Sequence, residues 1–220
     1  MLIKDLITDT IPSIKLSDPV HLGLQLMQDY HVTHLAVCDD EGKLTGIMTE
    51  DALLDADDQL LIQDITLPLP GLTVKPEEHF LQAVELAAKH HLSVVPVSDN
   101  AHNLQNSIAA NTLLEQASNF MQLETPGALV VLEMSLWQYS LSQLCRIVEG
   151  NDAAITQLNT TKIEGSDNLL VTMRINKIEV SDIVAAFQRY EYTVRYYYGE
   201  ELYTNDLKSN YENLMNYLNI

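Results

Sequence analysis

Val32-Thr33-His34-Leu35-Ala36-Val37-Cys38-Asp39 returns sixty residues later as Leu92-Ser93-Val94-Val95-Pro96-Val97-Ser98-Asp99. The same offset carries Leu53-Leu54 to Leu113-Leu114. We expect a two-residue length difference, between Ser17-Asp18 and residues 75–78, to interrupt this register. A repeated supersecondary unit cannot bury its apolar face alone, so two copies must pack on each other. Such packing creates clefts between the copies, and clefts bind ligands.

The charge of the chain excludes some partners. The formal net charge is −19, and residues 1–120 hold five lysines and no arginine against 18 acidic residues. Nucleic acid and an anionic membrane surface would be repelled by such a protein. We therefore expect neither as a partner.

The remaining composition is typical of a cytoplasmic protein. With 46% hydrophobic residues, the 220-residue chain can build one large core or two smaller ones. No apolar run approaches the roughly 20 residues of a membrane span, and the N-terminus lacks a secretion signal. Cys38 and Cys145 lie far apart in apolar segments, which favours buried thiols in a reducing compartment.

Each copy reads as β-α-β-β-α. In copy one a short strand over 13–16 precedes a helix that Ser17 or Asp18 caps, with Pro19 at its first position. Its predicted buried stripe consists of Val20, Leu22, Leu26, Met27 and Tyr30. Strands at 35–38 and 44–48 follow, and then a helix from about Thr49. Copy two repeats the order with a strand at 72–74, a helix around residues 80–86, strands at 94–97 and 107–108, and a helix at 112–117. A matching segment precedes each copy, Ile3–Ile7 and Ile62–Thr66.

These copies resemble cystathionine-β-synthase-type (CBS) domains, and the pair resembles a Bateman module. The resemblance spans about residues 1–118. It rests on the segment before each copy, the apolar strand that ends in Val-x-Asp, the Asp-Glu-Gly-Lys-Leu turn ending at Leu44, and Gly46-Ile47-Met48-Thr49.

The resemblance implies binding of the adenosine part of AMP, ATP or S-adenosylmethionine as a regulatory ligand. In the family, adenine lies against the backbone before the Pro-Val strand, and a Gly-h-h-Ser/Thr-x-x-Asp motif holds phosphate and ribose. Copy one keeps the hydroxyl of Thr49 but has Ala52 at the acidic position, with Asp51 displaced by one residue, and Ala36 in place of proline.

Copy two departs further from the motif. It keeps Pro96 but has Asn106, Ala109 and Thr112 where the motif has glycine, hydroxyl and acid. Copy one is therefore the better candidate for a ligand. The predicted ligand-binding residues are Ile14, His34, Leu35, Ala36, Thr49, Asp51, Leu72, Val94, Val95, Pro96 and Thr112.

The second half has a different pattern. Strand 128–135, a helix around residues 141–148, a hairpin of 153–163 with 168–175, a helix around residues 183–187 and strand 193–198 follow the βαββαβ, ferredoxin-like plan. Residues 141–155 resemble the first helix and second strand of ACT domains, which often bind amino acids. The bulky run Ser135–Tyr139 stands where ACT ligand sites have a glycine turn, so we do not expect amino-acid binding here.

The predicted fold class is mixed α/β: a CBS-domain pair, then a ferredoxin-like ACT-like domain and a C-terminal helix. The expected domains are CBS repeat 1 at 1–58, CBS repeat 2 at 59–122, a linker at 123–127, the ACT-like domain at 128–200 and a helix at 201–220. This layout resembles the acetoin utilisation regulator family, which implies a regulatory protein.

The remaining candidates for metal ligands or catalytic residues are expected to have structural roles. The histidine pairs at 31/34 and 90/91 lack further ligands at metal spacing, and the aspartates at 51, 55, 57 and 58 read as a solvated face. No nucleophile motif or phosphate loop is present. We expect no metal, no catalytic residue and no enzymatic activity.

Assembly is expected through the second half. Val194, Tyr196 and Tyr198 are predicted to share one face of the last strand, and Leu207, Tyr211, Leu214 and Leu218 form a helical apolar stripe. The tyrosine-rich end fits either internal packing or an oligomer interface. We expect a homodimer and an unidentified regulated protein as partners. The function predicted is a non-enzymatic sensor; the alternative is a ligand-free interaction scaffold.

Overall fold

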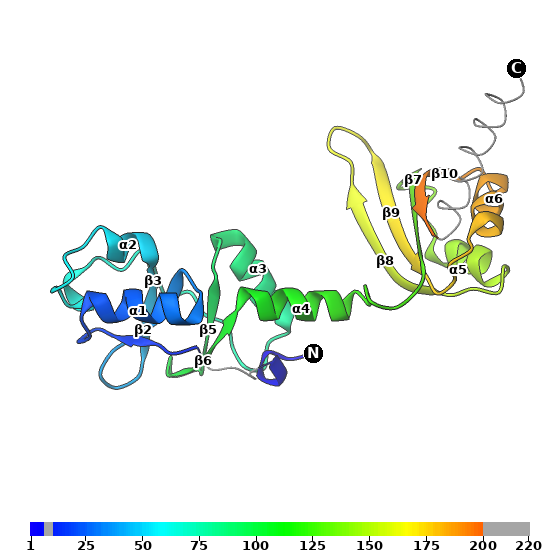
Figure 1. Ribbon diagram of the computed structural model, residues 1–220. Helices are drawn as coiled ribbons and strands as arrows, with labels where there is room; N and C mark the ends of the chain where they lie inside the picture. The colour runs from blue at the N-terminus through cyan, green and yellow to red at the C-terminus, as the bar shows by residue number, and fades with distance from the viewer. Residues whose placement is uncertain (7–10, 200–220) are drawn as a thin grey trace, which may run out of the picture. The chain divides into compact units, whose positions relative to one another are not determined.

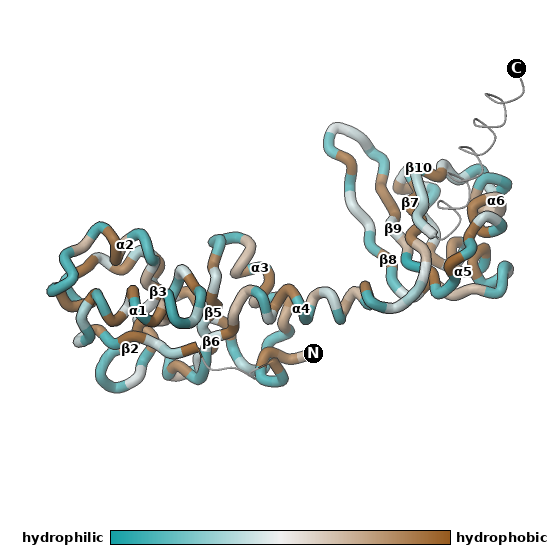
Figure 2. Tube along the Cα trace, in the orientation of Figure 1, coloured by the Kyte–Doolittle hydropathy of each residue, from teal (hydrophilic) through white to brown (hydrophobic). Residues whose placement is uncertain are grey.

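A computed structural model describes residues 1–6 and 11–199. The chain divides into two compact units, residues 1–120 and 121–220 (Figure 1). Hydrophobic segments meet inside each unit (Figure 2). The predicted helix at 201–220 and its apolar stripe lie outside the described residues. None of the described helices is long and apolar enough to cross a membrane.

Unit one contains the two copies. Copy one runs through η1 (Ile3–Leu6), β1 (Ile14–Lys15), α1 (Val20–Tyr30), β2 (His34–Cys38), β3 (Leu44–Thr49) and α2 (Glu50–Leu54). Copy two runs through η2 (Ile62–Asp64), β4 (Leu69–Pro70), α3 (Phe80–His90), β5 (Val94–Ser98), β6 (Leu104–Ala109) and α4 (Ala110–Phe120). The predicted order of elements is confirmed for both copies, except that the strand expected at 72–74 is only a single bridge from Val74 to Val97.

The predicted two-residue interruption of the register is wrong. The backbone N–H of Lys15 donates to the Asp18 carboxylate at 2.8 Å, and that of Lys75 donates to the Glu78 carboxylate at 2.9 Å. The offset of sixty is therefore unbroken through this turn and through α1 and α3. The offset changes by one residue only further upstream, where the N–H of Leu61 bonds Asp64 as that of Leu2 bonds Asp5.

The two copies exchange their leading segments. The N–H of Ile3 donates to Glu78 O at 3.0 Å in copy two, and the N–H of Ile62 donates to Asp18 O at 2.9 Å in copy one. Ile3 and Ile62, both fully buried, lie in the apolar core of the opposite copy. Neither copy can complete its core without the other's chain.

The strands interlock the copies further. β1, β2, β3 and β4 form one sheet, in which Leu69 and Pro70 of β4 pair with Ile47 and Gly46 of β3. A Cβ on Gly46 would lie 2.7 Å from Leu69 O, so only glycine permits this approach. β5 and β6 form a separate two-stranded sheet.

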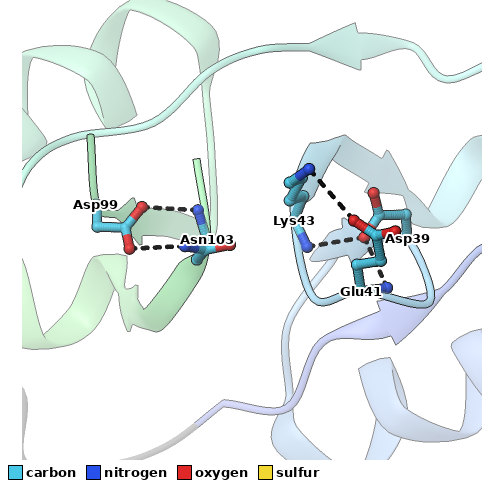
Figure 3. A network of polar contacts seen from close by, with 5 residues as sticks. All are labelled: Asp39, Glu41, Lys43, Asp99 and Asn103. Carbon is cyan, nitrogen blue, oxygen red and sulfur yellow. Dashed lines mark hydrogen bonds and ion pairs between the residues drawn. The ribbon is translucent and has the colours of Figure 1, made fainter. Parts of the chain in front are cut away.

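The turns after β2 and β5 also join the copies. Asp39 accepts the N–H groups of Glu41 and Lys43, and Asp99 accepts that of Asn103 (Figure 3). Asp99 also accepts the N–H of Ala101. A pair of reciprocal backbone bonds then connects the two turns, Leu44 N to His102 O at 2.8 Å and Leu104 N to Gly42 O at 3.1 Å. The aspartate of the Val-x-Asp pattern thus shapes the turn that holds the copies together.

Two details of α1 differ from the prediction. Pro19 precedes the helix instead of starting it, because the Asp18 carboxylate closes the turn after β1 and does not cap α1. Val20, Gly23 and Met27 are its buried residues. Tyr30 is 47% exposed, because the last turn passes beyond the core.

Unit two confirms the βαββαβ plan. Its elements are β7 (Ala128–Ser135), α5 (Leu141–Glu149), β8 (Ile155–Lys162), β9 (Asn168–Ile175), α6 (Ser181–Arg189) and β10 (Thr193–Tyr198). The strands form one antiparallel sheet in the order β10-β7-β9-β8, which is the ferredoxin-like order. Leu144 and Phe187, from the two helices, are fully buried against Val130, Leu132 and Met173 of the sheet.

The predicted common face of β10 is wrong. Its register with β7 shifts between Val194 and Tyr196, where a β-bulge adds one residue. Val194 and Tyr197 therefore pack against the core, while Tyr196 and Tyr198 are 48% and 58% exposed and their rings lie 5.5 Å apart.

Candidate functional site

A polar seam joins the copies where β2 and β5 begin. The N–H of Thr33 donates to Ser93 Oγ at 2.9 Å, and the N–H of Ser93 donates to His34 Nδ1 at 3.2 Å. Nδ1 also lies 3.1 Å from Ser93 Oγ and 3.0 Å from Thr33 Oγ1. Because Nδ1 accepts from a backbone N–H, the neutral ring carries its proton on Nε2.

His34 is held in its neutral form. Burial lowers the pKa of this imidazole, and the negative charge of Asp51 opposes the shift without cancelling it.

Thr49 lies beside His34. The two residues are partners in the β2–β3 ladder, so their side chains share one face of the sheet. Thr49 caps α2, where its Oγ1 accepts the N–H of Ala52 at 3.3 Å. Since the hydroxyl accepts in this bond, its own proton remains available to a ligand.

The residue at the acidic position of the motif, Ala52, packs against the core. Ala52 is half-buried against the apolar core of copy one, so a carboxylate there would enter that core. Asp51, one residue earlier, is exposed. Asp51 therefore approaches the site from a different side of α2 than the family motif requires.

The other predicted site residues could offer a ligand mainly their backbone groups. The side chains of Ile14, Leu35 and Val94 are fully buried in the core of copy one. Val95 is buried in the core of copy two, and Leu72 packs at its margin. Ala36 and Pro96 are also buried. Among the predicted residues, the structure places His34 beside Thr49, and Asp51 follows two residues later on α2.

Copy two offers a different environment. Thr112, half-buried in the first turn of α4, is the counterpart of Ala52. Ser107 is 1% exposed, and its hydroxyl has no hydrogen-bond partner among the described residues. Lys75 is tied to Ser98 Oγ at 3.1 Å and to Asp99 O.

Sequence reasoning missed Thr33 and Ser93. Both stand at the same place in the repeat, one residue before the apolar strand. The signal that could have identified the seam was a hydroxyl at both positions, directly before a mainly apolar strand.

Equivalent hollows lie between the helices of each copy. One, of about 410 Å³, is lined by Leu24, His31 and Leu54 with their neighbours, and the other, of about 420 Å³, by Val84, His91 and Leu114 with theirs. These residues correspond at the offset of sixty. Leu54 and Leu114, at the hollows, are 64% and 69% exposed.

No cluster of three or more metal-ligating side chains occurs within residues 1–6 and 11–199. The histidines at 31 and 91 instead end α1 and α3 in the left-handed backbone conformation.

Residues 3–58 match the CBS domain family. A CBS domain pair/ACT domain protein from Thermotoga maritima is 26% identical, with a TM-score of 0.51, over 55% of this chain and 99% of that one. The first half of this chain is a CBS domain pair. The mixed α/β fold of the whole chain, with its ACT-like second unit, agrees with this relationship.

Two further proteins are similar to part of the chain. A curated homoserine O-acetyltransferase of Methanocorpusculum labreanum is 28% identical over 116 residues, which are 51% of this chain and 23% of that protein. This chain thus spans about a quarter of the curated relative's length. The CBSX2 protein, solved in complex with AMP, is 21% identical with a TM-score of 0.46 over 55% of this chain and 98% of that one.

The hydrogen bonding of two serines in the CBS pair predicts different effects of their replacement. Ser93→Ala should lower the free energy of unfolding by about 1–3 kcal/mol, because the N–H of Thr33 loses its acceptor. Ser107→Ala should be neutral or stabilising, because it removes a buried hydroxyl without a described partner. Urea denaturation of both variants measures the difference, and equal losses would contradict the assigned roles.

The state of His34 predicts a pH dependence. Because its pKa is lower in the folded than in the unfolded chain, its contribution to stability is complete above the usual value of 6.5 and is lost as pH falls below that value. His34→Asn keeps an acceptor for the N–H of Ser93 but does not titrate. Denaturation between pH 8 and pH 5 should show a smaller loss of stability in the variant, and superimposable pH profiles would refute the assignment.

Proposed function

We propose that this protein is a regulatory sensor that binds an adenosine derivative in the copy-one cleft of its CBS pair. The observation that carries the proposal is the pairing of Thr49 with His34 at the seam between the copies. A ligand there would touch the hydroxyl of Thr49 and the backbone of residues 34–36, and would lie beside the hydrogen bonds that hold the copies together. Binding could then favour one arrangement of the copies over another, which is what regulation requires.

Copy two is the weaker site. Asn106 and Ala109 replace the glycine and the hydroxyl of the motif. The protein acts without catalysis in this proposal, and a regulated partner protein in the cytoplasm reads its state.

Thr49 provides the test of the ligand site. Thermal shifts with AMP, ATP and S-adenosylmethionine should show stabilisation of the parent chain, which amounts to about 2.7 kcal/mol at a ligand concentration of 100 times Kd. Thr49→Val should lose the shift, whereas Thr49→Ser keeps the hydroxyl and the α2 cap and should retain it. The absence of any shift in the parent chain, or an unchanged shift in Thr49→Val, would refute the site.

A homodimer transmits the change. The exposed Leu54 and Leu114 lie at equivalent places beside the helical hollows, and Tyr196 and Tyr198 form an exposed aromatic pair on the sheet of unit two. Two-fold pairing buries such surfaces on both subunits at once. The second unit contributes substantial contact to this dimer.

Light scattering at micromolar concentration tests the assembly. The full chain should be a dimer, and Tyr196→Ser with Tyr198→Ser should weaken it because an apolar contact is lost. Leu54→Glu with Leu114→Glu is the matched change on the CBS pair. A monomeric full chain would refute the dimer, and dissociation by the leucine pair alone would place the interface on unit one.

A further inference from the structure

The chain leaves unit one through α4, and the last residue of this helix is anchored there. Phe120 ends α4 and is 49% exposed, yet its ring contacts two rings of copy two. The centroid of Phe120 lies 5.5 Å from that of Phe80, edge to face, and 6.1 Å from that of His79. Phe80 is fully buried in the core of copy two. The end of α4 is therefore held on unit one by aromatic contacts.

The chain that enters unit two is bound by an arginine. Arg174 lies on β9, on the face of the sheet opposite to the helices, because the residues on either side of it are buried in the core. Its Nη2 donates to Leu123 O at 3.4 Å and also to Thr125 O. Hydrogen bonds donated by a charged group are stronger than those between neutral groups. One guanidinium thus holds two backbone carbonyls of the predicted linker, residues 123–127.

Two further contacts fasten the same segment to unit two. A Cβ on Gly127 would clash with Ile175 O, so glycine is needed where the chain passes the end of β9. The N–H of Ala128 then donates to Lys177 O at 3.0 Å. Residues 123–127 are therefore attached along their length to unit two, and they do not act as a free connection.

Two residues, Met121 and Gln122, separate the anchor on unit one from the anchor on unit two. The Cα atoms of Phe120 and Leu123 lie at most about 11 Å apart, because consecutive Cα atoms are about 3.8 Å apart. Gln122 has a φ of 50°, in the left-handed region that a side chain with a Cβ disfavours. Its carbonyl accepts the N–H of Thr125 at 3.1 Å, which closes the turn that Arg174 holds. The joint is therefore short, and its second residue is fixed by the turn that follows.

We propose that Arg174 clamps the connection between the two units, so that Met121 and Gln122 form their pivot and a movement of α4 is passed directly to unit two. α4 begins at Ala110, immediately after β6 of copy two, and its first turn contains Thr112, at the acidic position of the motif. A rearrangement of the CBS pair that displaces this helix then reaches unit two without a flexible linker to absorb it. The inference goes beyond the proposed adenosine site and holds with or without a ligand.

Pulsed electron double resonance on the ligand-free full chain tests the clamp. Cys38→Ser and Cys145→Ala remove the native thiols. Asp29→Cys on α1 and Gln188→Cys on α6, both at exposed positions, then carry one spin label on each unit. Dilution with unlabelled chain removes distances between copies. We expect a narrow distribution of distances in this parent, and Arg174→Ala should broaden it about twofold or more because the linker leaves the sheet and lengthens the pivot.

Arg195→Ala is the matched control. Arg195 lies on β10 of the same sheet, and its Nε is 3.3 Å from Glu133 Oε2, so its removal should leave the width of the distribution unchanged. Hydrogen–deuterium exchange of residues 123–127 should become about tenfold faster in Arg174→Ala and stay the same in Arg195→Ala. A parent distribution as broad as that of Arg174→Ala, or equal effects of the two variants, would overturn the clamp. Because no ligand is present, either result leaves the adenosine site standing.

Discussion

The reciprocal exchange of leading segments between the two copies is the contact on which the rest of unit one depends. Ile3 fills the core of copy two and Ile62 that of copy one, each fixed by backbone hydrogen bonds to the turn before a helix. Full burial of one such side chain contributes about 1.5–3 kcal/mol. Because each copy lacks this contribution without the other, neither is expected to fold alone, and the seam between them is a permanent feature.

The two copies correspond closely, so the positions at which they differ point to the candidate site. The turns after β2 and β5 and the contacts of the leading segments obey the repeat. The seam departs from it, because His34 provides an imidazole where copy two has Val94, and the N–H of Ser93 uses that imidazole instead of a hydroxyl. The same copy keeps Thr49. These two polar groups lie in copy one, which is where the ligand is proposed to bind, whereas the polar departures of copy two are Asn106, Ser107 and Thr112.

The sequence predicted the elements of both units well, because apolar spacing and the repeat report directly on burial. It misplaced details that depend on a single side-chain contact. Asp18 looked like a helix cap but bonds the preceding turn, and the bulge between Val194 and Tyr196 reverses the faces of β10. Neither the hydrogen bond of Asp18 nor the bulge in β10 can be inferred from the spacing of hydrophobic residues.

The candidate site was predicted only in part. Thr49 was predicted from the motif and His34 as backbone before the strand, and the structure pairs these two residues across β2 and β3. The seam through Thr33 and Ser93 was missed, since a hydrogen bond between residues sixty positions apart becomes visible only when the copies are packed. Ala52 stands at the acidic position of the motif, and its packing against the core of copy one becomes visible only in the structure.

Hydrogen–deuterium exchange measured by mass spectrometry on the full chain tests the interlocked pair most directly. Under conditions in which exchange reports opening equilibria, the slowest amides of β2 and of β5 should share one opening free energy, because the copies unfold together. Removal of the apolar contact by Ile3→Ala should lower that value equally in both strands. Opening of β5 at a clearly lower free energy than β2, or an effect of Ile3→Ala confined to copy two, would contradict the account.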